Sequence, residues 1–144
     1  MKIPALQTDG LLPPGLYLAG LQEIEERFGK STRKRAMLYS RLKMFVILAQ
    51  HCGASRVFVN GSFVTQKPEP GDIDVVIWLG KEFLQMLLEK DSQALLLQQM
   101  FLRRKPEEAF LVTDQQGWDE WFEFFSVFKS NPKQRKGLIE VKLK

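Results

Sequence analysis

The sequence predicts an α/β protein of the mixed α+β kind, and two observations support this fold class. Short apolar runs rich in β-branched and aromatic residues, as expected of strands, occur at residues 55–60, 72–79, 109–113 and 138–143. Segments with apolar residues at three- and four-residue spacing, as expected of helices, precede or separate these runs. The chain has 144 residues, of which 44% are hydrophobic, and this fits one domain with a core of its own.

The N-terminal segment differs in composition from the rest of the chain. Residues 1–18 contain three prolines and two glycines, so we expect an extended arm that packs on a single domain spanning residues 19–144. No apolar stretch is long enough to cross a bilayer, and the prolines interrupt any signal-peptide core, so we expect a cytoplasmic protein with no membrane partner. A single cysteine, Cys52, beside the only histidine, His51, excludes an internal disulfide and a one-chain Cys/His zinc site.

The periodicity of the apolar residues predicts five helices. They are expected over residues 19–29, from a cap at Ser31 or Thr32 to Gly53, over residues 81–105 with a break at Asp91 or Ser92, and over residues 117–129. The last helix carries an aromatic stripe made of Trp118, Trp121, Phe122, Phe125 and Phe128. We expect this stripe to pack in the core, with stacking on a nucleic-acid base as the alternative. Residues 63–71 and 130–137 are expected to be loops.

The net charge of +4 is modest, but the basic residues are unevenly spread. Residues 30–43 contain Lys30, Arg33, Lys34, Arg35, Arg41 and Lys43 and no acidic residue. Such a run attracts phosphate in a nucleotide, a nucleic acid or an acidic partner, or it forms a solvated helix face. Charge alone does not decide between these interpretations.

The most informative stretch is VFVNGSFVTQKPEPGDIDVVIWL, residues 57–79. Asp72 and Asp74 lie two residues apart at the start of a predicted strand, so their side chains point to the same face. Each carboxylate raises the pKa of the other unless a proton or a cation lies between them. Mg²⁺ favours one or two carboxylates together with substrate phosphates, so the pair predicts a magnesium site that is completed by a nucleotide.

The Gly61-Ser62 pair ends the preceding strand. A glycine turn there can expose backbone N–H groups beside a hydroxyl, and together these make a small concavity that binds anions. We therefore expect Gly61 and Ser62 to seat a triphosphate. Lys67, in the loop that follows, is a candidate contact to a phosphate or to the acceptor, with a solvated loop position as the alternative.

These residues resemble the nucleotidyltransferase superfamily of the DNA polymerase β type. Its signature is an apolar strand, Gly-Gly or Gly-Ser, about nine to thirteen residues, then Asp, an apolar residue, Asp or Glu, and an apolar residue. Gly61, Ser62 and residues 72–75 match it, while Asn60 stands where the family more often has an apolar residue. The opening IPALQTDGLLPPG, the EIEERFG helix and KGLIEV further look like small bacterial and phage proteins of that superfamily. The likeness spans most of the chain, although only the residue 61–75 signature is chemically specific.

The resemblance implies a small mixed β-sheet backed by helices, and a site with two Mg²⁺ ions held by Asp72 and Asp74. It implies transfer of a nucleoside monophosphate from ATP or another triphosphate to a hydroxyl, with release of pyrophosphate. It also implies a third carboxylate on a later strand, for which the candidates are Asp114 and Glu140. If neither serves, the metal site is incomplete and the protein binds nucleotide without turning it over.

The acceptor is not identified by these residues. Minimal nucleotidyltransferases of the superfamily include antitoxins that modify a partner toxin, so a partner protein is one candidate acceptor. The alternative is a catalytically degenerate binding module, such as an antitoxin that acts by occlusion. Nucleic-acid binding through residues 30–43 is a third hypothesis, and no groove-reading motif supports it.

Overall fold

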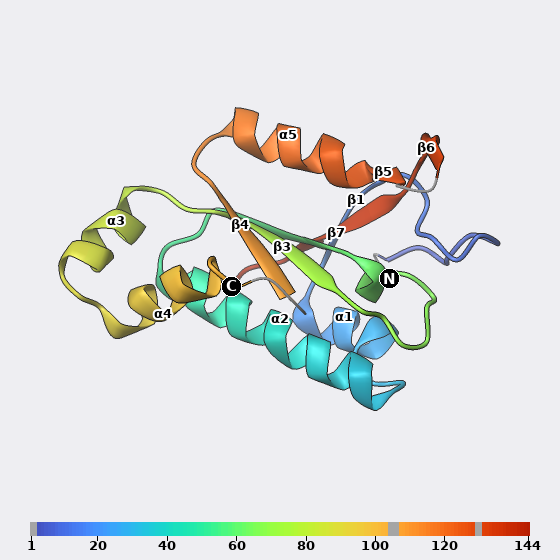
Figure 1. Ribbon diagram of the computed structural model, residues 1–144, viewed down its shortest axis with the longest axis horizontal. Coiled ribbons are helices and arrows are strands. Elements are labelled where there is room, and N and C mark those ends of the chain that lie inside the picture. Colours follow the sequence, from blue (N-terminus) through green and yellow to red (C-terminus); the bar gives the residue numbers. More distant parts are fainter. Residues whose placement is uncertain (1–2, 104–106, 129–130) are drawn as a thin grey trace.

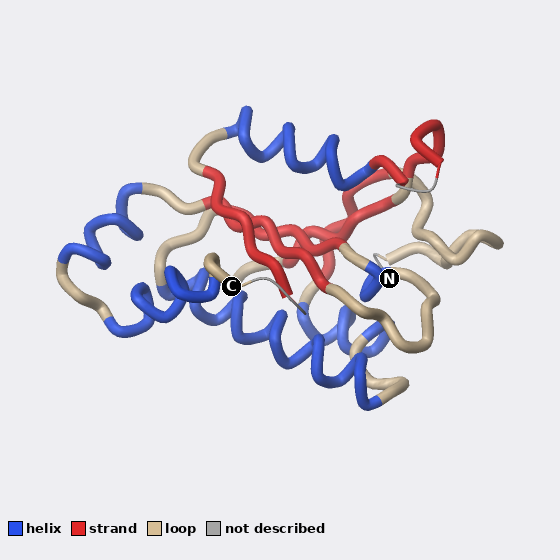
Figure 2. Tube along the Cα trace, in the orientation of Figure 1, coloured by secondary structure: helices blue, strands red, loops and turns tan. Residues whose placement is uncertain are grey.

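The computed structural model describes residues 3–103, 107–128 and 131–144. Within these ranges the chain forms one five-stranded mixed sheet, a separate two-stranded ribbon and five α-helices, which confirms the α+β class (Figures 1 and 2). The strands are β1 (Gly15–Ala19), β2 (Arg56–Asn60), β3 (Ile73–Trp78), β4 (Glu107–Val112), β5 (Val127–Phe128), β6 (Asn131–Arg135) and β7 (Gly137–Val141). The helices are α1 (Leu21–Phe28), α2 (Arg33–His51), α3 (Lys81–Leu88), α4 (Ser92–Met100) and α5 (Gln115–Ser126), with a short 3₁₀ turn, η1 (Ser62–Val64).

The strand order of the main sheet is β1-β7-β2-β3-β4. β3 and β4 run parallel, β1 and β7 run parallel, and β2 is antiparallel to both of its neighbours. The carboxyl end of β2 and the amino ends of β3 and β4 therefore meet at one edge of the sheet. Helices α1 and α2 cover one face of the sheet, and α5 crosses the other (Figure 1).

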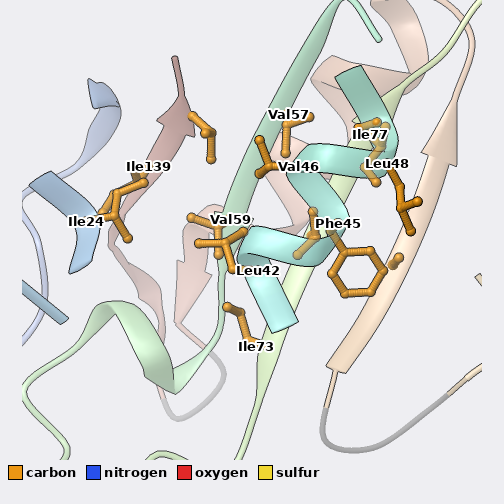
Figure 3. Close-up of a cluster of buried hydrophobic side chains, with 14 of the residues drawn as sticks. Ile24, Leu42, Phe45, Val46, Leu48, Val57, Val59, Ile73, Ile77 and Ile139 are labelled. Atoms are coloured by element: carbon orange, nitrogen blue, oxygen red, sulfur yellow. The ribbon is translucent and has the colours of Figure 1, made fainter. Parts of the chain in front are cut away.

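Both faces of the sheet are buried. Against α2, the branched side chains of β2 and β3 pack with apolar residues of the helix; this group includes Leu42, Phe45, Val46, Val57, Val59, Ile73 and Ile77 (Figure 3). On the opposite face Phe58 packs edge-on against Trp118 of α5, with ring centroids 4.9 Å apart. Burial on both faces explains why β2 and β3 consist of nearly continuous apolar runs. Trp118 and Phe125 lie in this second core, so the core interpretation of the aromatic stripe holds for both.

Side-chain caps mark the first residues of α2 and α4. The Thr32 hydroxyl, rather than Ser31, caps α2 by accepting a hydrogen bond from the Arg35 amide, and Asp91 caps α4 in the same way. The thiol of Cys52 is buried just after α2. In the described ranges every helix is too short or too polar to span a membrane.

Four segments differ from the sequence prediction. Residues 127–128, expected to belong to the aromatic helix, form the short strand β5 instead. Residues 15–19, partly within the expected arm, form the edge strand β1, which pairs with β7. β4 begins at Glu107, two residues before the expected strand. Residues 131–135, expected to be part of a loop, form β6 and pair with β5, where an edge strand tolerates the proline at position 132. Lys129, at the end of the expected aromatic helix, lies outside the described residues.

Candidate functional site

Asp72 and Asp74 lie at the sheet edge where β2 ends and β3 and β4 begin. Ile73 and Val75 are buried in the core on the α1 and α2 side. Because side chains alternate along a strand, Asp74 points to the opposite face, toward the α5 layer. In the sheet register Asp74 lies opposite Asn60 of β2.

A cavity of 420 Å³ brings the predicted motif together. Its sheet-side wall consists of Asn60, Gly61, Ser62, Asp72 and Asp74. Its other wall consists of Glu123, Phe124, Phe125, Val127 and Lys136, from α5, β5 and the link between β6 and β7. The sequence motif supplies the polar wall, and residues far along the chain supply the other wall.

The Ser62 hydroxyl is directed at Asp72 rather than into open space. It donates a hydrogen bond to Asp72 Oδ1 at 2.6 Å, and the Ser62 amide donates to the same oxygen at 3.0 Å. The hydroxyl in turn accepts from the amides of Gly71 and Asp72. The amide of Phe63 donates to the Asp72 carbonyl. These polar groups of the turn therefore orient the Asp72 carboxylate, and the seating of a triphosphate by Gly61 and Ser62 stays a prediction.

Gly61 makes this arrangement possible. Its φ of +98° lies in the region that side-chain-bearing residues rarely adopt. A Cβ on residue 61 would lie 2.9 Å from the Asp72 carbonyl oxygen and 3.0 Å from the Ile73 Cα. Only glycine lets the turn pack directly on the start of β3, and this close packing places Ser62 against Asp72.

Asn60 is a site residue that the sequence motif did not identify. Its side chain is only 3% exposed, and its Oδ1 is buried without a hydrogen-bond partner among the described residues. A buried amide oxygen without a hydrogen-bond partner costs free energy of folding, so the unpaired Oδ1 of Asn60 needs an explanation. A polar residue at the end of an otherwise apolar strand was the only signal in the sequence.

The donor set of this edge consists of oxygen atoms and fits Mg²⁺. Among the described residues, no group of three or more His, Cys, Asp or Glu side chains is placed to hold a metal ion. Asp72, Asp74 and Asn60, which all carry side-chain oxygen atoms, nevertheless line one cavity. Mg²⁺ is usually held by one or two carboxylates, with the remaining ligands supplied by water and substrate phosphates.

The two residues expected to supply a third carboxylate lie elsewhere. Asp114 caps α5 by accepting a hydrogen bond from the Gly117 amide at 2.8 Å, beyond the far end of β4 and roughly 20 Å along the strand from its start. Glu140 accepts two hydrogen bonds from the Arg56 guanidinium, at 2.7 and 2.8 Å. These bonds raise the pKa of Arg56, which also lies over the Trp118 ring. Neither acidic residue lines the cavity.

Glu108 is a carboxylate that the topology brings into register with Asp74, although it does not line the cavity either. It is the direct partner of Asp74 in the parallel pairing of β3 with β4. Strand alternation places it on the same face as Phe110 and Val112, which pack in the α5 core, and therefore on the same face as Asp74. The sequence prediction missed Glu108 because it began this strand at residue 109.

Lys67 lies beside the cavity rather than in it. It lines a neighbouring open hollow of 660 Å³ with residues of the N-terminal arm, including Asp9 and Gly10. The two hollows share Ser62 and Lys136 in their linings. A ligand that extends out of the cavity past Ser62 would therefore enter the hollow that contains Lys67.

Arg35 is the exception within the basic run. Its side chain is 4% exposed, and its guanidinium donates hydrogen bonds to the carbonyl oxygens of Phe28, Phe63, Thr65 and Lys67. Burial lowers the pKa of Arg35, and the nearby Glu69 carboxylate partly opposes this shift. Arg35 is therefore neither part of a phosphate-binding surface nor on a solvated helix face. Its hydrogen bonds connect the loop after β2 to α1 and α2.

Comparisons with known proteins locate the chain in one family. A protein-family model described as a family of unknown function (DUF6932) matches residues 4–142. No curated protein and no solved structure matches the chain.

Proposed function

Because the chain belongs to DUF6932, whose function is unknown, its activity has to be inferred from its own residues, and we propose that it is a magnesium-dependent nucleotidyltransferase. It moves a nucleoside monophosphate from a nucleoside triphosphate, such as ATP, to a hydroxyl of an acceptor. The observation that carries the proposal is the shared cavity, in which Gly61, Ser62, Asp72 and Asp74 meet at one sheet edge. A partner protein is our candidate acceptor.

The roles of the residues follow from this geometry. Asp72 and Asp74, with the Asn60 amide oxygen, hold Mg²⁺, and the two ions of the superfamily would neutralise the triphosphate when bound. Ser62 and Gly61 act on the nucleotide indirectly, by fixing the Asp72 carboxylate. The acceptor oxygen forms a bond to the α-phosphorus as the bond to the pyrophosphate oxygen breaks, and a carboxylate of the site takes the hydroxyl proton.

Calorimetry tests the proposal. ATP, GTP, CTP and UTP are titrated into the protein with and without Mg²⁺, and the titrations are repeated with the Asp72→Asn, Asp74→Asn double variant. We expect one nucleotide to bind only when both Mg²⁺ and the two carboxylates are present. Asp114→Asn is the matched control, because it removes a carboxylate that lies outside the cavity. Equal, metal-dependent binding by wild type and the double variant would refute the site.

The third carboxylate is tested by a comparison of two glutamates. Glu108→Gln removes a charge that lies in register with Asp74, and it should weaken Mg²⁺-dependent nucleotide binding. Glu140→Gln breaks the pair with Arg56, and it should lower the free energy of unfolding while leaving nucleotide affinity unchanged. The opposite pattern would assign the third carboxylate to Glu140.

A second candidate function is a binding module without catalysis that acts by occluding a partner. The observation that favours it is that no group of three or more metal-ligating side chains of these types occurs within the described ranges. The two functions are separated by an assay of acceptor modification with labelled nucleotide. A partner that is neutralised equally well by wild type and by the Asp72→Asn, Asp74→Asn variant, with no label transferred, would favour the binding module.

A further inference from the structure

Phe124 is an aromatic residue exposed beside the candidate site. Its side chain is 59% exposed, although most large apolar residues of α5 are buried or half-buried. It lies on α5, which crosses the sheet face to which Asp74 points (Figure 1). It lines the same cavity as Asp72 and Asp74, in the wall that faces the sheet. It lies outside the aromatic stripe of Trp118, Trp121, Phe122, Phe125 and Phe128.

Neighbouring rings hold Phe124 in place. Its ring centroid lies 5.6 Å from that of Trp121 at 90° and 5.2 Å from that of Phe125 at 75°. Both are edge-to-face arrangements, which aromatic pairs prefer. Phe125 is buried and anchored against Phe58, so the cluster is fixed to the sheet. Phe124 therefore presents a preorganised aromatic surface rather than a loose side chain.

The cavity has two chemically different walls. Asn60, Ser62 and the two aspartates make the sheet side polar, and Phe124, Phe125 and Val127 give the other side an apolar surface beside Glu123 and Lys136. Its volume of 420 Å³ falls within the range of small-molecule sites, which are about 300–1,000 Å³. A ligand that fills it has an anionic, metal-binding part and a flat apolar part.

We propose that Phe124 is the platform on which the base of the nucleoside triphosphate stacks. This inference rests on the proposed function and extends it from the phosphates to the base. Stacking on an aromatic ring needs only the flat π-face that every base has, and it leaves the identity of the base to other contacts. The competing occupant, an apolar side chain of a protein acceptor, is distinguished by the experiment below.

The experiment compares the affinity of Mg²⁺-ATP with that of Mg²⁺-tripolyphosphate, which lacks the base and the sugar. Both are titrated by calorimetry into wild type, Phe124→Ala and Phe124→Trp, with GTP, CTP or UTP in place of ATP if one of these is the preferred nucleotide. Leu88→Ala is the control, because Leu88 is 78% exposed on α3 and lies outside the cavity. Near-ultraviolet circular dichroism checks that each variant is folded.

We expect Phe124→Ala to weaken nucleotide binding by about tenfold or more, in line with the loss of one base-aromatic stack. Tripolyphosphate should bind all variants equally, Phe124→Trp should retain nucleotide affinity, and Leu88→Ala should change nothing.

Three results would overturn the inference. Unchanged nucleotide affinity in Phe124→Ala would overturn the stacking inference alone. The proposed function would still stand if tripolyphosphate bound in a way that depends on Mg²⁺, Asp72 and Asp74. An equal loss for nucleotide and tripolyphosphate would mean that Phe124 shapes the phosphate end instead. Failure of wild type to bind either compound would overturn both the inference and the proposed function.

Discussion

Replacing Arg35 with methionine should destabilise the protein far more than the same replacement of any other basic residue in the run. The Arg35 guanidinium lies between the α1–α2 layer and the loop after β2, where it donates to four backbone carbonyls. Methionine fills a similar volume but donates nothing. The Arg35→Met variant therefore leaves the carbonyls of residues 28, 63, 65 and 67 without this donor.

The magnitude follows from the hydrogen bonds lost. A hydrogen bond to a charged group contributes about 1.5–3 kcal/mol, and four are removed. Water can reach the partly buried carbonyls in the variant, and the cost of burying the charge is no longer incurred, so the bonds do not add in full. We expect the free energy of unfolding to fall by about 3–5 kcal/mol.

Urea denaturation measures this change. The midpoint of Arg35→Met should move to lower urea with an unchanged slope, which identifies a stability change rather than an altered unfolded state. Arg33→Met is the matched control, since Arg33 lies on the same helix and is exposed. Hydrogen exchange should also accelerate over residues 62–65. A difference below about 1 kcal/mol between the two variants would refute the role of Arg35, because ordinary surface substitutions fall within that range.

Three other substitutions test separate parts of the structure. Gly61→Ala should lower the free energy of unfolding by about 2 kcal/mol or more, measured by thermal unfolding, because residue 61 has a positive φ and an added Cβ would contact the start of β3. Gly71→Ala should change it little, because an added Cβ there meets open space. Phe58→Ala should cost about 3–5 kcal/mol, because it opens a cavity under α5; a loss below 1 kcal/mol would contradict this packing. Hydrogen bonds to the Asp91 carboxylate, the strongest of them from the Ala94 amide, lower its pKa. The ionised carboxylate therefore stabilises the fold at pH values above the ordinary carboxyl pKa, and this contribution is lost as the pH falls through the lowered pKa. The difference in stability between wild type and Asp91→Asn should therefore disappear in acid.

Features that depend on neighbouring residues in the chain could be predicted from the sequence. The caps at Thr32 and Asp91 follow from side chains that bond amides three residues later. The common face of Asp72 and Asp74 follows from strand alternation alone. The meeting of Asp72 with Ser62 follows from the nine residues that separate them in the connection between two adjacent strands.

The basic run shows where one-dimensional patterns mislead. Six cations without an acid suggested a charged surface, yet Arg35 is buried. A signal was present, because Arg35 lies three residues before Leu38 and seven before Leu42, on the face that carries the buried apolar residues of α2. The prediction from composition used the charge of Arg35 and did not use its position on the helix.

The remaining site residues come from contacts between segments far apart in the chain, which no local pattern encodes. Glu108 was missed because glutamate is depleted in strands, yet pairing with β3 carries it into β4 and sets it opposite Asp74. Phe124 was missed because helical periodicity selects the residues that face the core, and Phe124 lies off that stripe. The side of the site that we propose to bind phosphate and metal could therefore be predicted from residues 61–75. The side that would recognise the base depends on where α5 crosses the sheet, and only the fold reveals it.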